Sequence, residues 1–216
     1  MNKKLTDKEI KTVLNILENT YPEAKSELNF SNPFEMLIST ILSAQCTDKQ
    51  VNKVTEKLFQ EYKCPKDFLS LSEEELGEKI KSCGFYKNKS KNILGTCKML
   101  EEQYNGQVPD DRDELMKLPG VGRKTANVVI SNAYKKDAIA VDTHVFRVSN
   151  RIGLADSNDV YETEMQLMNN IDKKMWSKAH HLLIFHGRRI CKSRKPSCEI
   201  CPINEYCLYY KDNIRE

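Results

Sequence analysis

The chain has 216 residues, which is enough for one or two compact domains with a buried core. Its formal net charge is only +3, and the 30% of residues that are charged mix both signs along the chain. The chain as a whole is therefore not a polycation, and any nucleic-acid surface has to be local. Residues 1–25 lack the apolar core of a signal peptide and no run approaches the length of a membrane span, so we expect a cytosolic protein.

Apolar residues recur at helical spacing through the first half of the chain. Asn32 before Pro33 places a good capping residue ahead of a proline at the first helical position. Thr47 and Gln50 have the spacing of a capping box, and Gly84 marks a helix end. The predicted helices of this half cover 32–45, 47–62, 72–84 and 88–104.

The second half of the chain is helical as well. Residues 138–141 form its only strand-like run, which is too short and isolated to suggest a sheet. The helices predicted here cover 113–118, 124–133, 143–151, 159–171 and 174–186. The fold class is therefore predicted to be all-α.

A glycine-rich turn joins the helices predicted at 113–118 and 124–133. Gly120 and Gly122 allow positive φ and a close approach to another surface. Two helices joined in this way aim backbone N–H groups at one point, where a phosphate can bind. Lys124 lies in the first turn of the second helix, where the positive end of the macrodipole disfavours an ammonium, so we expect a lowered pKa. A lysine that is easily deprotonated beside a DNA phosphate is a candidate nucleophile. A plain turn with a surface lysine is the alternative, because Gly-x-Gly alone recurs by chance.

Asp142 follows the apolar run 138–141 and precedes the helix predicted at 143–151. Taken alone, this position indicates a helix N-cap, which is a common task for aspartate. Capping leaves the carboxylate able to take part in chemistry as well.

Four cysteines near the C-terminus have the spacing C-x6-C-x2-C-x5-C: Cys191, Cys198, Cys201 and Cys207. Thiolates at this density can enclose one metal centre. Structural zinc more often uses two C-x2-C pairs, of which this segment has one, whereas an iron–sulfur cluster is held by four thiolates. Zinc stays a minor alternative. The remaining cysteines fall in or beside apolar helical stretches, and we expect them to be buried small hydrophobic residues: Cys46, Cys64, Cys83 and Cys97.

Three of these segments resemble the endonuclease III family of DNA glycosylases. Residues 118–126 are similar to its helix-hairpin-helix, 141–148 to the segment with its catalytic aspartate, and the four-cysteine spacing to its [4Fe-4S] loop. The resemblance extends over most of the chain, about 29–210. It implies two helical domains that flank a DNA-binding groove. Their expected extents are 26–135 for a six-helix domain, and 1–25 with 136–216 for a discontinuous domain that holds the cluster loop, 191–207.

The resemblance also implies roles for single residues. Lys124 and Asp142 would be catalytic, and Cys191, Cys198, Cys201 and Cys207 would hold the [4Fe-4S] cluster. The residues expected to contact DNA are Gln45, Phe85, Leu118, Gly120, Val121, Gly122, Arg123, Lys192, Arg194 and Lys195.

Two of these residues would extrude the damaged base from the duplex, as a glycosylase must. Gln45 ends a Leu-Ser-Ala-Gln segment, and Phe85 lies in the Gly-x-Tyr turn where the family usually has a leucine wedge. An aromatic ring can also unstack bases. Without the resemblance, Gln45 is simply a polar residue at a helix end and Phe85 a core aromatic. Asp48 is a further candidate for the base pocket.

The resemblance predicts a bifunctional enzyme that removes oxidised or otherwise damaged pyrimidines from duplex DNA in base excision repair. It would act as a monomer, through a lysine Schiff base and β-elimination, as a DNA glycosylase and abasic-site lyase. One alternative is a non-catalytic module that binds DNA structures, although binding requires neither Lys124 nor Asp142. The other is an abasic-site lyase without base excision, which the sequence separates poorly because the same lysine serves both steps.

Overall fold

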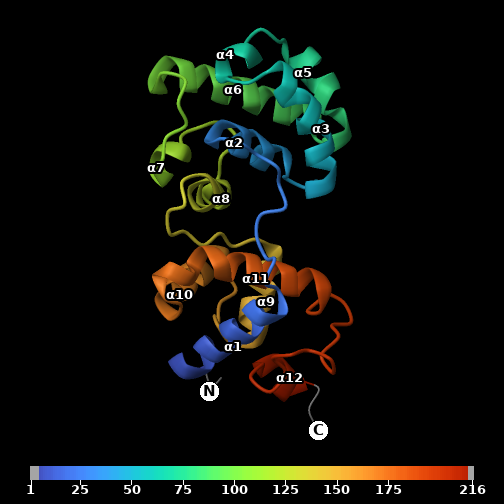
Figure 1. The fold of residues 1–216 in the computed structure, drawn as a ribbon, viewed down its shortest axis with the longest axis vertical. Coiled ribbons are helices and arrows are strands. Elements are labelled where there is room, and N and C mark those ends of the chain that lie inside the picture. The colour runs from blue at the N-terminus through green and yellow to red at the C-terminus, as the bar shows by residue number, and fades with distance from the viewer. Residues whose placement is uncertain (1–4, 214–216) are drawn as a thin grey trace. The chain divides into compact units, whose positions relative to one another are not determined.

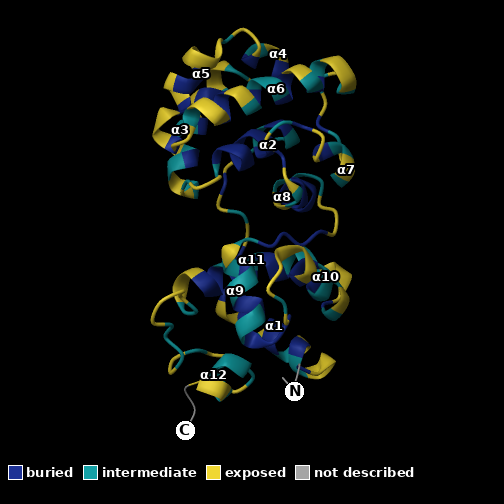
Figure 2. Cartoon of the chain, turned by 180° about the vertical axis from the view of Figure 1, so that it is seen from behind, coloured by how far each residue is buried: buried dark blue, intermediate teal, exposed yellow. Residues whose placement is uncertain are grey.

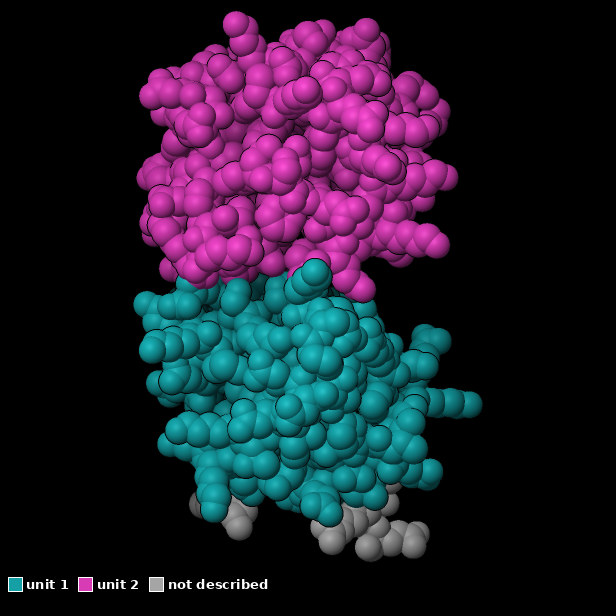
Figure 3. All heavy atoms as spheres, viewed as in Figure 1, with its two compact units in different colours: residues 1–25, 137–216 teal, residues 26–136 magenta. Residues whose placement is uncertain are grey.

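The computed structural model describes residues 5–213, and within them every regular element is a helix (Figure 1). The all-α prediction is therefore confirmed. The chain divides into two compact units: unit 1 is formed by 1–25 and 137–216, and unit 2 by 26–136 (Figure 3). Residues 1–4 and 214–216, the ends of the predicted discontinuous domain, lie outside the described residues. In the described part of the chain, no helix combines the length and apolar character needed to cross a bilayer.

Unit 2 is built around α2, whose residues from Met36 to Leu42 are all buried (Figure 2). This helix packs against α3, α6 and α8, while α4 and α5 pack on α6. The helices of unit 2 are α2 (Pro33–Leu42), α3 (Asp48–Glu61), α4 (Pro65–Phe68), α5 (Glu73–Ile80), the 3-10 helix η1 (Lys81–Cys83), α6 (Tyr86–Tyr104), α7 (Arg112–Leu115) and α8 (Arg123–Ala133). Asn32 caps α2 by accepting from the N–H of Glu35, and Thr47 caps α3 by accepting from that of Gln50. The capping box predicted at Thr47 is only half formed, because the Gln50 side chain donates to Ser82 Oγ at 2.8 Å instead.

Unit 1 has its core between α9, α11 and α1. Val145 and Val148 of α9, Leu17 of α1, and Leu182 and Leu183 of α11 are completely buried. The helices of unit 1 are α1 (Asp7–Thr20), α9 (Thr143–Ile152), α10 (Val160–Asn170), the 3-10 helix η2 (Lys173–Met175), α11 (Trp176–Arg189) and α12 (Leu208–Asn213). A long loop between α11 and α12 carries the four C-terminal cysteines.

Helix α11 ends at Arg189, three residues beyond its predicted end, and two other helices end three residues early. The helix expected to reach Gln45 ends at Leu42, and Gln45 has a left-handed backbone with φ of 53°. The first helix of the glycine turn ends at Leu115 rather than Leu118, because a turn replaces its last residues. Both early ends lie beside predicted DNA-contacting residues, where loops rather than helices present side chains.

Candidate functional site

The turn between α7 and α8 uses its two glycines differently. Gly120 has φ of 74°, and a Cβ there would lie 2.8 Å from the side-chain nitrogen of Asn92, so the fold itself requires glycine. Gly122 is the extended N-cap of α8, with φ of −89°, and a Cβ there would meet no atom within 4 Å. No protein atom therefore excludes a larger residue at position 122. A molecule bound close to this position would exclude one, because it would leave no room for a Cβ.

The predicted contact residues Leu118 and Val121 lie in the core, with 2% and 6% of their surface exposed. The N–H of Val121 donates to the carbonyl of Leu118 at 3.1 Å and closes the turn. Apolar packing therefore holds their side chains inside, so the predicted contact of these residues with DNA is left to the backbone of the turn. They anchor the turn, and no side chain caps the N-terminus of α8 that follows it.

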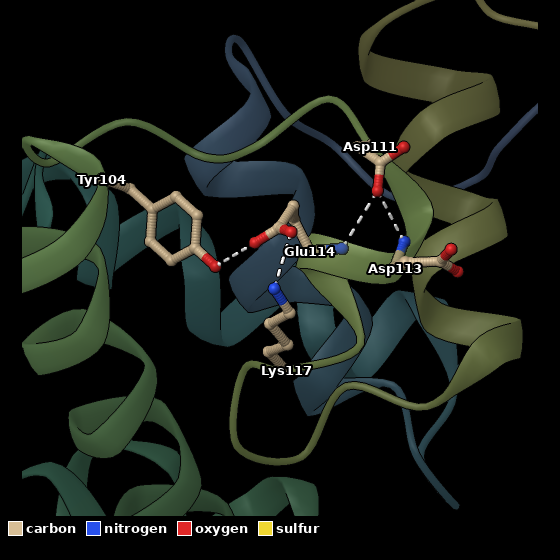
Figure 4. Close-up of polar contacts among 5 residues, drawn as sticks. All are labelled: Tyr104, Asp111, Asp113, Glu114 and Lys117. Atoms are coloured by element: carbon tan, nitrogen blue, oxygen red, sulfur yellow. Dashed lines mark hydrogen bonds and ion pairs between the residues drawn. The ribbon is translucent and has the colours of Figure 1, made fainter.

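A polar network fixes the four-residue helix α7 (Figure 4). Asp111 caps it, accepting through Oδ1 from the N–H groups of Asp113 and Glu114 at 2.8 and 3.1 Å. The Glu114 carboxylate accepts from Lys117 Nζ at 2.6 Å and from the Tyr104 hydroxyl of α6 at 2.8 Å. The hydrogen bond from Lys117, and after it the one from Tyr104, lower the pKa of Glu114. These bonds attach α7, and hence the start of the turn, to α6.

The two predicted catalytic residues each begin a helix. Lys124 is the second residue of α8 in unit 2, and its side chain is exposed. Asp142 is the N-cap of α9 in unit 1 and is half-buried. Its Oδ1 accepts from the N–H groups of His144 and Val145 at 2.8 and 2.7 Å. The capping interpretation of Asp142 is confirmed, and because both bonds end on one oxygen, Oδ2 takes part in neither.

Gln45 and Phe85 lie in two loops of unit 2 and are both exposed, Phe85 by 63%. Each has a left-handed backbone, with φ of 53° and 48°. A non-glycine residue rarely adopts this conformation unless its surroundings hold it there, and such residues cluster at functional sites. The alternative that Phe85 is a core aromatic is therefore wrong. Asp48 is half-buried at the first position of α3.

The four C-terminal cysteines of unit 1 affect one another through their charges. Burial, together with the smaller effect of the charges of Cys207, Cys191 and Cys198, raises the pKa of Cys201 to about 11. All four sulfurs are thus within electrostatic reach of one another, and none forms a disulfide. Among residues 5–213, no three side chains of metal-binding type converge tightly enough to hold a single ion. The donor set, four thiolates with a single C-x2-C pair, is the set that holds an iron–sulfur cluster.

Two arginines on α9 brace the cysteine loop, and sequence reasoning missed them. Arg147 donates to the carbonyl of Cys191 through Nε and Nη2 at 3.2 and 3.0 Å. Arg151 lies with Nη1 3.6 Å from Cys191 Sγ and donates to the carbonyl of Lys192 at 2.8 Å. Their spacing of four residues on one helix face was the available signal. Positive charge at this place offsets the negative charge of four thiolates.

The remaining four cysteines differ in their burial. Of the cysteines expected to be buried, Cys83 and Cys97 are, whereas Cys46 and Cys64 are partly exposed because they lie in loops beside helix starts. The loop between Cys191 and Cys198 presents three exposed cationic side chains: Lys192, Arg194 and Lys195.

Comparison with known families identifies the chain. Residues 38–174 match the HhH-GPD superfamily of base excision DNA repair proteins, and residues 191–207 match the iron–sulfur binding domain of endonuclease III. The endonuclease III of Bacillus subtilis (strain 168) is 53% identical over 201 residues, covering 93% of this chain and 92% of that protein. The chain belongs to the endonuclease III family.

Solved structures of endonuclease III agree with this. A non-covalent complex of an endonuclease III with DNA superposes with a TM-score of 0.92 at 51% identity, covering 98% of this chain and all of that one. A trapped covalent intermediate between an endonuclease III and DNA gives the same TM-score, identity and coverage. The predicted activity is thereby confirmed: the protein is a DNA glycosylase and abasic-site lyase of base excision repair. The prediction of an iron–sulfur cluster is also confirmed, and the matched cluster domain begins at Cys191 and ends at Cys207.

Proposed function

We propose that the protein excises damaged pyrimidines from duplex DNA with Lys124 as nucleophile and Asp142 as its partner. The observation that carries the proposal is the exposed Lys124 in the first turn of a helix that no side chain caps, directly after a glycine turn open to an outside surface. A related endonuclease III forms a covalent intermediate with DNA. An amine is the side chain that can bond to a sugar carbon in this way and then act as an electron sink.

The reaction begins with the uncharged amine of Lys124. Its lone pair bonds to C1′ of the extruded nucleotide while the bond between C1′ and the base breaks, and the base leaves with that electron pair and takes up a proton. The sugar ring then opens, and the ring oxygen takes up the proton that the amine loses. A Schiff base forms between Nζ and C1′. Loss of a proton from C2′ next expels the 3′ phosphate by β-elimination, and water releases the lysine.

Asp142 supplies negative charge to this sequence. Its Oδ1 is held by the first N–H groups of α9, which fixes the carboxylate in one orientation. The carboxylate stabilises the positive charge that develops on the sugar and accepts the proton that the lysine loses.

Gln45 and Phe85 open the duplex. Phe85 enters the base stack as an apolar wedge, and Gln45 fills the space left by the extruded base. Both side chains are exposed on loops, as this task requires.

The protein binds DNA through its phosphates. The hairpin brings Gly120, Gly122 and Arg123 to the backbone, and the loop cations Lys192, Arg194 and Lys195 contact it at a second place. Cys191, Cys198, Cys201 and Cys207 hold the cluster, which when bound supplies a fixed centre that braces this loop. The enzyme acts as a monomer.

The variant Lys124→Gln tests the proposal. It keeps a polar side chain but has no nucleophilic amine, so strand cleavage should be lost on duplexes that contain thymine glycol or an abasic site. Binding of the abasic duplex, measured by fluorescence anisotropy, should stay close to wild type. Full strand cleavage by the variant would refute the assignment of Lys124.

A further inference from the structure

Lys89 is a buried lysine in the middle of unit 2. It lies on α6 with 4% of its surface exposed. Its ammonium donates to the carbonyl of Leu42 at 2.8 Å and to that of Cys83 at 2.9 Å. Leu42 is the last residue of α2 and Cys83 is the last residue of η1. One cation therefore joins the C-terminal ends of two separate helices.

This arrangement is unusual because burial penalises a charged amine. The loss of water lowers the pKa of Lys89, and the thiols of Cys46 and Cys83 oppose that shift. The carbonyls at a helix C-terminus lack partners within the helix and carry the negative end of its dipole, which makes them suitable acceptors for a cation. The ammonium is thus held between two such ends rather than by an acidic side chain.

Both helix ends lead directly into the loops that carry the proposed base-extruding residues. Gln45 follows Leu42 by three residues, and Phe85 follows Cys83 by two. Gln45, Gly84 and Phe85 all have left-handed backbones, with φ of 53°, 71° and 48°. Such conformations persist when surrounding contacts over-determine them.

Two further contacts involve the same loops. The backbone N–H of Lys89 donates to the carbonyl of Phe85 at 3.0 Å, so Lys89 holds this loop through main chain and side chain together. The thiol of Cys46 lies close enough to Cys83 to raise the pKa of Cys83, after the larger effect of burial. Cys46 directly follows Gln45, so the two loops lie close together at this point.

We infer that Lys89 is a positioning residue for base extrusion: its ammonium fixes the loops of Gln45 and Phe85 relative to each other, so that both side chains enter the duplex together. The inference rests on the proposed roles of Gln45 and Phe85. Two side chains that must enter one base step depend on their mutual placement, and a shift of about 1 Å can cost about a hundredfold in rate.

The test compares Lys89→Met with Lys98→Met. Lys98 lies on the same helix but is exposed, so its substitution removes the same charge without touching the loops. Single-turnover rates are measured on a duplex with thymine glycol, which requires base extrusion, and on a duplex with a preformed abasic site, which has no base to unstack. Lys89→Met should slow base release by about ten- to hundredfold and slow abasic-site cleavage much less. Lys98→Met should match wild type on both substrates.

Hydrogen–deuterium exchange supplies a second readout. In Lys89→Met, exchange should rise at residues 43–46 and 84–86 and stay unchanged in α8. A base analogue such as 2-aminopurine beside the lesion should show a smaller fluorescence increase on binding, because the base step is opened less. Equal slowing on both substrates, or unchanged rates on both, would overturn the inference.

A replacement variant of Lys89 and two parallel variants are added to this experiment. If Lys89→Met does not fold, Lys89→Arg takes its place, since it retains a cation but moves its donors; the same split between substrates is expected, and rates equal to wild type on both overturn the inference.

Gln45→Ala and Phe85→Ala are measured in parallel. If they lose base release selectively while the Lys89 variant does not, the inference fails alone. If they also show no selective loss, the proposed roles of Gln45 and Phe85 fail, and the inference fails with them.

Discussion

At the scale of single residues, Asp142 has two tasks that substitution can separate. It caps α9 through Oδ1, and it is proposed to supply negative charge to the reaction. Asparagine caps a helix about as well as aspartate but carries no charge, whereas alanine does neither.

Asp142→Asn should therefore leave the free energy of unfolding almost unchanged while base release slows strongly. Asp142→Ala should lose about 1 kcal/mol of stability as well. Urea unfolding and single-turnover assays on thymine glycol duplexes measure the two effects. If Asp142→Asn were as active as wild type, capping would be the only task of this residue.

Gly120 and Gly122 of the hairpin should respond differently to the same substitution. Serine is a good N-cap and would meet no protein atom at position 122, so Gly122→Ser should change stability by no more than about 0.5 kcal/mol. DNA affinity should fall, because the added side chain occupies the space that the phosphate backbone would take. Gly120→Ser, which forces a side chain into a left-handed backbone and against Asn92, should instead cost about 1–3 kcal/mol of stability. Unchanged DNA affinity in Gly122→Ser would remove the hairpin from the proposed interface.

At the scale of elements, local signals in the sequence predicted where helices begin better than where they end. Asn32, Thr47 and Asp142 cap helices as expected, because an N-cap is a contact within a few residues. The end of α2 at Leu42 was missed, since a buried lysine 47 residues further along binds its last carbonyl. The short helix α4 was missed as well, because four residues carry too little periodicity.

The cysteine loop between α11 and α12 is the element whose structure depends on a bound group. Cys198→Ser should lose the visible absorbance of the cluster and weaken binding of abasic-site DNA. Cys97→Ser is the matched control, because Cys97 is buried in unit 2 and takes no part in the loop. Iron content and anisotropy titrations measure these effects. A Cys198→Ser protein with full iron content and normal affinity would contradict the proposed ligand set.

At the scale of the whole molecule, charge is distributed rather than concentrated. A net charge of +3 cannot by itself account for DNA binding, so local cations must supply the phosphate contacts. The sequence could point to Lys192, Arg194 and Lys195 through their place between two cysteines. It could not show that Leu118 and Val121 are buried, since burial depends on packing among distant segments.

Salt dependence tests these local cations. Replacing Lys192 and Lys195 together by glutamine should make the slope of log affinity against log salt shallower by about 1 for each phosphate that the protein no longer neutralises. Lys66→Gln, an exposed lysine of α4, should leave the slope unchanged. Titrations of an undamaged duplex at several salt concentrations give the slopes. An unchanged slope in the double variant would mean that the loop cations are merely solvated.

The proposed mechanism depends on a covalent bond between Lys124 and DNA. The most direct measurement is borohydride trapping on duplexes with thymine glycol or an abasic site, followed by peptide mapping of the adduct. An adduct is expected with both duplexes, located on Lys124 and absent from Lys124→Gln. An adduct on another residue would contradict the mechanism, and so would trapping by the Lys124→Gln protein.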